Sequence, residues 1–354
     1  MTNFSWPEVL SVLVGGHNLT QGQARWAMSE IMHGRASLAQ MGAFMMALRT
    51  KRETVQELTG LVDVMLDNAV KLETGSDALD IVGTGGDLVG TLNISSMASI
   101  VAAAAGVPVL KHGSRSASGK TGSSEMLEEL GIRLDLSPSQ VAKVFAKEGI
   151  TFFFAPVFHP AMRHVAPARK ELGVPTTFNF LGPLANPAQP IATALGVADA
   201  EIAPLMAAEL ATRGRTAIVF RSNDGLDELS TTSDNAIWQV SKGAIETFTF
   251  DAREIGIERV SVDALLGGDA RHNAQIAKKL FSGEEFQNSK AISDIVCLNA
   301  AVGITAYDLA KDSKESETEI NQRLSVAFAK SQTALTSGVA LAKTKHWSFL
   351  TQTI

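Results

Sequence analysis

The sequence predicts an α/β protein with a small α-helical N-terminal domain and a large α/β domain built on a mostly parallel central sheet. Helix-capping signals recur through the first seventy residues. From about residue 78, short apolar runs alternate with helical patterns. The chain has 354 residues, of which 45% are hydrophobic and 19% charged, so it can bury a large core. We therefore expect a helical domain at 1–75 and an α/β domain at 76–354.

Capping boxes carry the prediction for the helical domain. In a capping box, a Ser or Thr oxygen and a Glu or Gln three residues later satisfy unpaired backbone amides at the start of a helix. Four pairs fit this pattern: Ser5 with Glu8, Thr20 with Gln23, Ser37 with Gln40, and Thr54 with Glu57. Such helices must bury their apolar faces against each other, the rest of the chain or a second subunit.

Short apolar strands predict the sheet of the second domain. They are expected at 79–82, 107–110, 152–154, 194–197 and 217–220, with helices near 95–105 and 126–130 between them. Continuous apolar strands are typical of parallel sheets that are covered on both faces. Binding and chemistry then belong at the carboxyl ends of the strands.

Charge and cysteine content exclude several classes of protein. The net charge of −6 argues against a general nucleic-acid binder, which needs clustered positive charge. A single cysteine, Cys297, allows no intrachain disulfide, and its apolar surroundings favour a buried hydrophobic side chain. The N-terminus shows no signal-peptide pattern, and the longest apolar stretch, 100–110, is too short to span a bilayer. We expect a cytoplasmic protein.

Two loops predict a site for a phosphorylated ligand. Gly83-Thr84-Gly85-Gly86-Asp87 follows the first strand and leads to Asn93–Ser96, which opens a helix. The second loop, Lys111–Ser123, carries three cations and a histidine among small hydrogen-bond donors. The alternatives are a tight glycine turn for the first loop and a solvated charged loop for the second. Two such loops after neighbouring strands favour a ligand with more than one phosphate.

Two further features suggest a metal ion and a carboxylate ligand. Asp227 and Glu228 follow the strand at 217–220 and are candidates to bind Mg²⁺, the alternative being an Asp-Gly turn with solvated acids. Beside a polyphosphate site the metal is favoured. Arg169, near the end of a helix, has the fork geometry for a carboxylate, although a lone helix arginine is commonly a surface residue. His159 and His164 lack partners at zinc-ligand spacing.

Together these segments resemble the anthranilate phosphoribosyltransferases, which have the class II nucleoside phosphorylase-like fold. The resemblance covers nearly the whole chain in order and is carried by Asp80–Asp87 (DIVGTGGD), Asn93–Ser96, Lys111–Arg115 (KHGSR), Phe154–His164, Pro167–Gly173, Asn179–Pro187 (NFLGPLANP), Asp224–Ser230 (DGLDELS), Gly267–Ala274 (GGDARHNA) and Leu298–Ala301. It implies a helical domain to which a segment near 160–185 returns, and a homodimer formed through that domain. It also implies transfer of a phosphoribosyl group from 5-phosphoribosyl 1-diphosphate to the amine of anthranilate, in tryptophan biosynthesis.

The resemblance also assigns residues to each ligand. Those implied for phosphoribosyl diphosphate are Gly83, Gly86, Asp87, Thr91, Asn93, Ile94, Ser95, Ser96, Lys111, His112, Gly113, Ser114, Arg115, Ser116, Ala117, Ser118, Gly119 and Ser123. Those implied for anthranilate are Gly83, Ser114 and Arg169, and those for magnesium, at two ions per subunit, are Ser95, Asp227 and Glu228. The aromatic amine needs no strong general base, and Lys111 is expected to stabilise the leaving pyrophosphate.

Three positions depart from the family pattern. Ser96 stands where the family has Thr, Glu125 where Asp is usual, and Ser114 where it has Asn. A serine hydroxyl cannot present the separate donor and acceptor of an amide, so Ser114 leaves acceptor binding open. The alternatives are a pyrimidine nucleoside phosphorylase, whose substrate lacks the carboxylate that Arg169 would bind, and a non-catalytic nucleic-acid-binding relative of the same fold.

Overall fold

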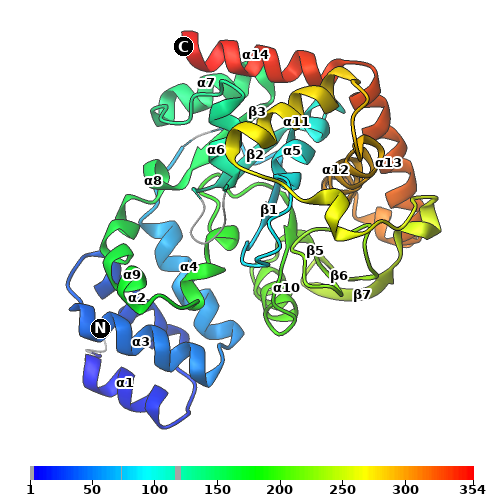
Figure 1. Ribbon diagram of the computed structural model, residues 1–354. Helices are drawn as coiled ribbons and strands as arrows, with labels where there is room; N and C mark the ends of the chain where they lie inside the picture. Colours follow the sequence, from blue (N-terminus) through cyan, green and yellow to red (C-terminus); the bar gives the residue numbers. More distant parts are fainter. Residues whose placement is uncertain (1–3, 73, 116–120) are drawn as a thin grey trace. The chain divides into compact units, whose positions relative to one another are not determined.

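The computed structural model describes residues 4–72, 74–115 and 121–354, which form two compact units (Figure 1). The first unit contains the chain up to Lys71 together with Ala155–Pro187. The second contains Leu72–Phe154 and Ala188–Ile354. The chain therefore leaves the second unit after its third strand, returns to the first for about thirty residues, and then completes the second.

The first unit is helical throughout its described residues. Its elements are α1 (Trp6–Val14), α2 (Gln21–Met32), α3 (Leu38–Lys51), α4 (Val55–Asp67), α8 (Ala155–Phe158) and α9 (Ala166–Leu172), with 3-10 turns η1 (Pro160–His164), η2 (Thr177–Asn179) and η3 (Gly182–Leu184). All four predicted capping boxes form at the starts of α1 to α4. The apolar faces meet in a core that includes Trp6, whose ring centre lies 5.3 Å from that of Trp26 and 6.0 Å from that of Phe44.

Two buried glutamates hold this unit together. Glu57 is fully buried and accepts hydrogen bonds from the backbone amides of Thr54 and Leu19, both at 2.8 Å. It also forms an ion pair with Lys51, at 2.9 Å. The carboxylate of Glu53 accepts a hydrogen bond from the hydroxyl of Thr177, which attaches the returning segment to the turn between α3 and α4. Because each carboxylate is paired, its burial does not leave an isolated charge.

The second unit is built on one seven-stranded sheet. Its strands are β1 (Leu79–Gly83), β2 (Val109–Gly113), β3 (Ile150–Phe154), β4 (Ala192–Gly196), β5 (Thr216–Ser222), β6 (Asn235–Ser241) and β7 (Ala244–Phe250). The order across the sheet is β3-β2-β1-β4-β5-β6-β7. The first five strands are parallel, and β6 and β7 form an antiparallel hairpin at one edge. The mostly parallel sheet confirms the predicted fold class.

Helices cover this sheet. They are α5 (Ile94–Ala104), α6 (Ser123–Glu129), α7 (Pro138–Glu148), α10 (Ile202–Thr212), α11 (Ala270–Ser282), α12 (Ser289–Lys311), α13 (Ile320–Thr336) and α14 (Val339–Thr353), with 3-10 turns η4 (Ala252–Ile255), η5 (Val262–Leu265) and η6 (Ser313–Glu317). α12 packs on β1, β4 and β5, while α10 packs on β5, β6 and β7 (Figure 1). A Cβ added at Gly303 of α12 would lie 2.7 Å from Ile81, so glycine permits the close approach to β1.

α12 is the core helix of the second unit. By length and composition it is the one helix, among the residues described, that qualifies to cross a membrane, but 83% of its apolar window is buried in the unit. Cys297 lies in this helix and is fully buried, as the sequence predicts. Burial raises the pKa of its thiol to about 12, which suppresses the reactive thiolate.

The second strand differs from its prediction. It was expected at 107–110, with Lys111 opening a loop, but β2 runs over Val109–Gly113. The reason is its neighbour: Lys111, His112 and Gly113 align in parallel register with the buried phenylalanines of β3. The polar composition of this segment concealed a strand whose pairing partner lies about forty residues away.

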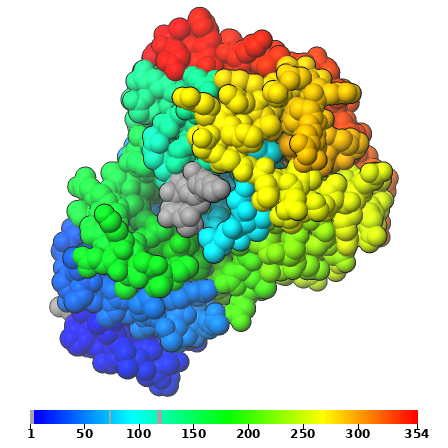
Figure 2. Space-filling view, viewed as in Figure 1, coloured from blue at the N-terminus to red at the C-terminus, as the bar shows by residue number. Residues whose placement is uncertain are grey.

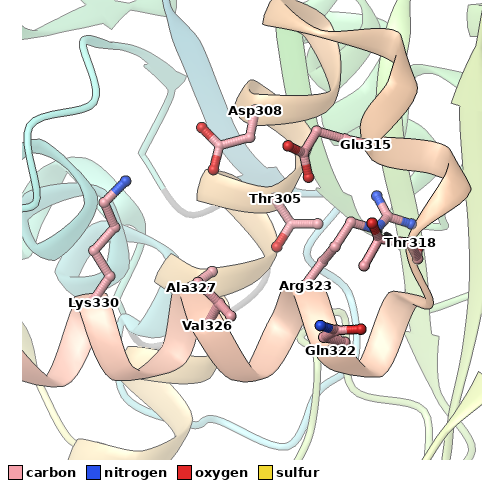
Figure 3. A pocket seen from close by; sticks show the side chains of 9 residues that line it. All are labelled: Thr305, Asp308, Glu315, Thr318, Gln322, Arg323, Val326, Ala327 and Lys330. Carbon is pink, nitrogen blue, oxygen red and sulfur yellow. Dashed lines mark hydrogen bonds between the residues drawn. The ribbon is translucent and has the colours of Figure 1, made fainter.

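A cavity of about 390 Å³ lies between α12, η6 and α13 (Figure 3). Its lining includes Asp308, Glu315, Arg323 and Lys330, with acidic and basic side chains in equal number. The adjoining end of α12 is joined to Asp77, just before β1, through Tyr307 and Lys311. The cavity is therefore associated with the amino edge of the parallel strands, opposite the edge where the sequence places the chemistry.

Candidate active site

The sheet has one point at which its strand order reverses, between β1 and β4. The chain after β1 continues to β2 and β3 on one side, whereas the chain after β4 continues to β5 on the other. Loops that leave the carboxyl ends of such strands separate and open a crevice, which is where open α/β sheets bind ligands. The loop at 84–93 and the acidic loop at 223–234, which follows β5, lie at this point.

Two glycines bring the acidic loop onto the ends of β1 and β4. Gly83 and Gly196 are register partners at the last positions of these strands. A Cβ at Gly83 would lie 2.2 Å from Oδ2 of Asp227, and one at Gly196 would lie 1.7 Å from its backbone oxygen. No side chain fits in either place. Asp227 therefore packs directly against the carboxyl ends of β1 and β4.

The acidic side chains of this loop strongly perturb one another. Oδ2 of Asp227 accepts a hydrogen bond of 2.7 Å from the backbone amide of Gly85. Burial, together with the nearby charge of Asp87, raises the pKa of Asp227 to about 7. Burial and the charge of Asp227 raise the pKa of Glu228 well above its usual value. Carboxylates held this close favour a bound cation or a retained proton.

Lys111 supplies a buried positive charge that interacts with these acidic side chains. Its side chain is 1% exposed, and its Nζ donates to the backbone oxygen of Ile81 at 2.6 Å and to Oγ of Ser95 at 3.5 Å. Burial lowers the pKa of Lys111, an effect opposed by the surrounding carboxylates of Asp80, Glu228 and Asp227. The prediction that Lys111 opens a loop is therefore wrong, because Lys111 lies on β2, which carries its side chain into the interior.

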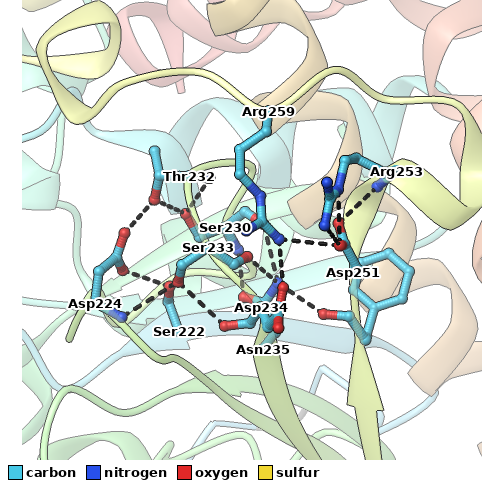
Figure 4. Close-up of polar contacts among 11 residues, drawn as sticks. Ser222, Asp224, Ser230, Thr232, Ser233, Asp234, Asn235, Asp251, Arg253 and Arg259 are labelled. Carbon is cyan, nitrogen blue, oxygen red and sulfur yellow. Dashed lines mark hydrogen bonds and ion pairs between the residues drawn. The ribbon is translucent and has the colours of Figure 1, made fainter.

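A hydrogen-bonded network fixes the rest of the acidic loop (Figure 4). Asp224 accepts hydrogen bonds from the hydroxyls of Ser222 and Thr232. Asn235, at the start of β6, accepts from the amide of Ser230 at 2.7 Å. From α12, the amide side chain of Asn299 accepts from the backbone N–H of Leu229 and donates to its oxygen, both at 2.9 Å. Asp227 and Glu228 are thereby held from both sides of the loop.

The glycine loop after β1 has the backbone that its sequence requires. Gly85, Gly86 and Gly90 all have positive φ, at 67°, 86° and 77°. Leu88 shares this conformation at 58°, and its side chain is 80% exposed. Positive φ at several positions turns successive amides in different directions from those of a strand or helix, as in loops that bind anions.

The predicted phosphate-loop residues divide into exposed and buried sets. Gly86 is exposed, and Gly83, Asp87, Thr91, Asn93 and Ser95 keep part of their surface. The side chains of Ile94 and Ser96 are buried within α5. Their side chains therefore lie away from the surface of the loop.

The predicted ligand residues around the end of β2 differ in exposure and in their partners. His112 is buried in the strand, where its backbone amide donates to Asp80 at 3.1 Å. Ser114 is exposed, and Arg115 forms a 2.8 Å ion pair with Glu128 while its guanidinium lies 5.6 Å from the ring centre of Phe154. At the far end of the loop, the Ser123 hydroxyl donates to the backbone oxygen of Ser114 at 3.4 Å. The predicted residues Ser116, Ala117, Ser118 and Gly119 lie outside the described residues.

Arg169 belongs to the first unit. It lies on α9, half-buried, and burial lowers the pKa of its guanidinium without removing the charge. Across 4–72, 74–115 and 121–354 no hydrogen bond or ion pair engages this side chain. His159, earlier in the same returning segment, is a structural residue. It is buried, its Nε2 contacts the backbone oxygen of Ala185 at 2.9 Å, and burial lowers its pKa to about 4.

Comparison with known proteins identifies the class first. Residues 75–338 match the a/b domain of a glycosyl transferase family, and residues 7–69 match the helical bundle domain of the same family. The fold and the strand-end site are those of a two-domain glycosyl transferase. Within that class, the chain belongs to the anthranilate phosphoribosyltransferase family and is an enzyme of this type.

Individual relatives cover almost the entire chain. The anthranilate phosphoribosyltransferase of Leifsonia xyli is 48% identical over 343 residues, which is 97% of each chain. Among solved structures, that of Thermus thermophilus is 36% identical with a TM-score of 0.86, covering 97% of this chain and 99% of its own. The Saccharomyces cerevisiae enzyme in complex with PRPP and Mg is 24% identical, with a TM-score of 0.87 over 99% of this chain and 98% of its own, and shows the shared fold.

Several residues of the site were not found from the sequence. Gly196 and Asn299 have no distinctive motif around them, because their roles depend on a loop that is distant in the chain. Asn273 lies in the GGDARHNA segment, which carries part of the resemblance but suggests no chemistry by itself. Asp80 could have been found from the sequence, because a charged residue within an apolar strand must have a buried partner.

Proposed function

We infer that this enzyme transfers the phosphoribosyl group of 5-phosphoribosyl 1-diphosphate to the amine of anthranilate, in tryptophan biosynthesis. The products are N-(5-phosphoribosyl)anthranilate and pyrophosphate. The observation that carries the inference is the arrangement at the strand reversal, where a glycine loop and buried carboxylates meet at the ends of β1 and β4. Together with membership of the family, this arrangement favours a diphosphate sugar over a nucleoside.

The reaction requires alignment of two substrates and stabilisation of the leaving group. The amine nitrogen forms a bond to the anomeric carbon while the carbon–oxygen bond to diphosphate breaks. The electron pair of that bond departs with pyrophosphate, and the amine then loses a proton. Because the aromatic amine is already nucleophilic, the site can act mainly by positioning and by stabilising the developing charge.

The sugar diphosphate is proposed to bind along the two loops. Its contacts are assigned to Gly83, Gly86, Asp87, Thr91, Asn93–Ser96, Lys111–Gly119 and Ser123. The positive-φ glycines and the start of α5 support this assignment, because both direct backbone amides toward an anion. The exposed Ser114 and the partly exposed Ser123 add hydroxyl donors.

Magnesium fits the acidic loop. The raised pKa values of Asp227 and Glu228 indicate two carboxylates that a cation would stabilise, and Ser95 lies at the start of the adjoining helix. Among the described residues, no group of three or more His, Cys, Asp or Glu side chains forms a metal site, which suits an ion that takes few protein ligands. We propose two Mg²⁺ per subunit, which would neutralise charge on the departing pyrophosphate.

Lys111 is proposed to stabilise the leaving group from beneath the site. Its Nζ already has the Ile81 oxygen as a close partner, and its side chain is 1% exposed. Its positive charge would therefore act over a short distance through a low-dielectric interior. It would also offset the repulsion among the acidic side chains above it.

The acceptor is assigned to Gly83, Ser114 and Arg169. A half-buried guanidinium with no partner in the described parts of the chain suits a carboxylate ligand such as that of anthranilate. Ser114 offers a single hydroxyl at this position. We further propose that the enzyme is cytoplasmic and forms a homodimer through its helical unit.

The decisive test is anthranilate consumption, followed by its fluorescence, with phosphoribosyl diphosphate and Mg²⁺. We expect turnover that needs all three components. Parallel arms with a pyrimidine nucleoside and inorganic phosphate, and with DNA at several salt concentrations, test the two alternatives. Absence of turnover together with nucleoside phosphorolysis would overturn the inference.

A further inference from the structure

A short segment before α11 pairs with the glycine loop. The amide of Leu92 donates to the oxygen of Leu265 at 3.0 Å, and the amide of Gly267 donates to the oxygen of Gly90 at 2.9 Å. Between these bonds, Thr91 and Leu266 form an antiparallel bridge. Figure 2 shows this part of the chain, in yellow, against the cyan glycine loop on the surface of the unit. We refer to residues 265–273 as the brace.

Asn273 is the centre of the brace. Its side chain is 1% exposed, in the first turn of α11. Its Oδ1 accepts from the amide of Gly268 at 2.8 Å, and its Nδ2 donates to Oδ1 of Asn93 at 2.9 Å. The Nδ2 of Asn93 in turn donates to the backbone oxygen of Gly122 at 3.1 Å. The buried side-chain amide of Asn273 is therefore hydrogen-bonded to that of Asn93, which is in turn hydrogen-bonded to the end of the loop that follows β2.

The two ends of this connection are helix starts. Asn93 is the N-cap of α5, which follows the glycine loop. Gly122 is the N-cap of α6, at the end of the loop that follows β2. The hydroxyl of Thr121, beside it, donates to the backbone oxygen of Gly268 at 3.1 Å, so the brace also contacts the second loop directly. Both loops proposed to bind the sugar diphosphate are thus tied to one segment.

The packing leaves little freedom in the brace. A Cβ at Gly267 would lie 2.8 Å from the backbone oxygen of Thr91 and 2.9 Å from Oδ1 of Asn273. Glycine is therefore required where the brace crosses the glycine loop. The amide of Asn273 is required as well, because no other side chain of its length supplies both a donor and an acceptor.

We propose that Asn273 is a positioning residue for the sugar-diphosphate substrate. It sets the separation between the glycine loop and the loop before α6 without touching the ligand itself. A ligand that contacts both loops binds well only when their separation matches its length, so preorganisation of the two loops lowers the cost of binding. This proposal rests on the proposed function, since it deepens the role of the same site.

The test compares Asn273→Leu and Asn273→Asp with the wild-type enzyme. Leucine removes both hydrogen bonds, whereas aspartate keeps the acceptor for Gly268 and loses the donor to Asn93. We expect Asn273→Leu to raise the KM for phosphoribosyl diphosphate about tenfold or more, because the amide of Gly268 and Oδ1 of Asn93 both lose their partner. The kcat and the anthranilate KM at saturating sugar diphosphate should change much less. Asn273→Asp should raise the same KM at least as much as Asn273→Leu, because its second carboxylate oxygen would face Oδ1 of Asn93 in a buried position.

A matched control and a second variant separate this role from loss of folding. Gln275→Ala changes an exposed side chain of the same helix and should leave all constants near wild type. If Asn273→Leu does not fold, Thr121→Val removes only the contact to Gly268 and should still raise the same KM. Folded variants with an unchanged KM, or with a lower kcat alone, would overturn the proposal. A wild-type enzyme that fails to bind phosphoribosyl diphosphate in calorimetry would instead overturn the proposed function.

Discussion

Gly83 and Gly196 determine where the acidic side chains can lie. Because neither position has room for a Cβ, the main chain of Asp227 packs directly on the ends of two strands. The consequence is electrostatic: the carboxyl loses water and gains the neighbouring charge of Asp87. The pKa of Asp227 near 7 therefore follows from backbone packing, not from the acidic sequence alone.

The raised pKa predicts how stability depends on pH in the absence of metal. The carboxyl of Asp227 has a pKa of about 7 in the folded chain, against its ordinary value of 3.8, which applies in the unfolded chain. Between these two pH values the folded chain therefore binds more protons than the unfolded chain. The free energy of unfolding should then fall as pH rises between these two values. In Asp227→Asn the free energy of unfolding should fall less steeply with pH, and the remaining dependence should come from Glu228, whose pKa is also raised. Urea unfolding from pH 5 to 8 measures this, and identical slopes for both proteins would contradict it.

The same carboxylates predict the metal requirement. Asp227→Asn combined with Glu228→Gln removes two negative charges while keeping the side-chain sizes. Half-maximal activity should then require about tenfold more Mg²⁺ or higher, since charge supplies much of the affinity for a hard cation. Asp224→Asn, in the same loop but bonded to Ser222 and Thr232, is the control. A metal titration that does not change would remove Asp227 and Glu228 from the site.

Substitution of Arg169 should affect the kinetics of the two substrates differently. Arg169→Ala should weaken the use of anthranilate by about tenfold or more, because a charge-assisted pair with its carboxylate is lost. The KM for phosphoribosyl diphosphate should change little. Arg169→Lys should recover only part of the loss, since an ammonium cannot form two parallel hydrogen bonds. Steady-state kinetics with each substrate varied in turn is the measurement, and an equal loss for both would count against the role.

Among the secondary-structure elements, the helix starts were the most predictable. Each capping box is local, so the sequence contains both partners within four residues, and all four form in the first unit. The parallel strands were also predictable, because a buried strand is a continuous apolar run. The hairpin of β6 and β7 was missed because β7 is mostly exposed and gives no such run.

Lys111 shows what local patterns cannot reveal. Its polar neighbours are typical of a loop, but pairing of β2 with β3 makes Lys111 part of a strand, and its side chain is buried. The brace was hidden for the same reason, since Asn273 and Asn93 are 180 positions apart. Site residues on the glycine and acidic loops could be proposed from composition, whereas those that position the loops depend on distant contacts.

Capping predicts a measurable contribution to stability. In the box at the start of α3, the hydroxyl of Ser37 accepts from the amide of Gln40 at 3.2 Å. Ser37→Ala should lower the free energy of unfolding by about 1 kcal/mol, the usual cost of losing an N-cap. Ser11→Ala, at an exposed position inside α1, removes no cap and should not destabilise the protein. Chemical denaturation followed by circular dichroism gives both values, and equal effects would contradict the assignment.

For the molecule as a whole, the main feature is that the chain crosses between its units three times. Residues 155–187 return to the helical unit after β3, so neither unit is a continuous piece of sequence. Local patterns find the helices and strands in each unit, but the point of return depends on contacts such as that of Thr177 with Glu53. Separate expression of residues 1–75 would leave out this returning segment.

The oligomeric state is the prediction that belongs to this scale. We expect sedimentation velocity to give the mass of two 37.5 kDa chains. The variants of Asp227, Glu228 and Asn273 should not change this mass, because these residues lie in the second unit, away from the helical unit through which the dimer is proposed to form. A monomer that retains full activity would exclude a dimer requirement.

The proton retained by Asp227 has a consequence for ligand loading. Near neutral pH a fraction of the carboxyl groups carries a hydrogen ion that must be released before a divalent ion can take its place. Entry of the ion should therefore acidify an unbuffered solution. The heat recorded on loading should vary with the ionisation enthalpy of the chosen buffer, and the slope of that variation counts the hydrogen ions released.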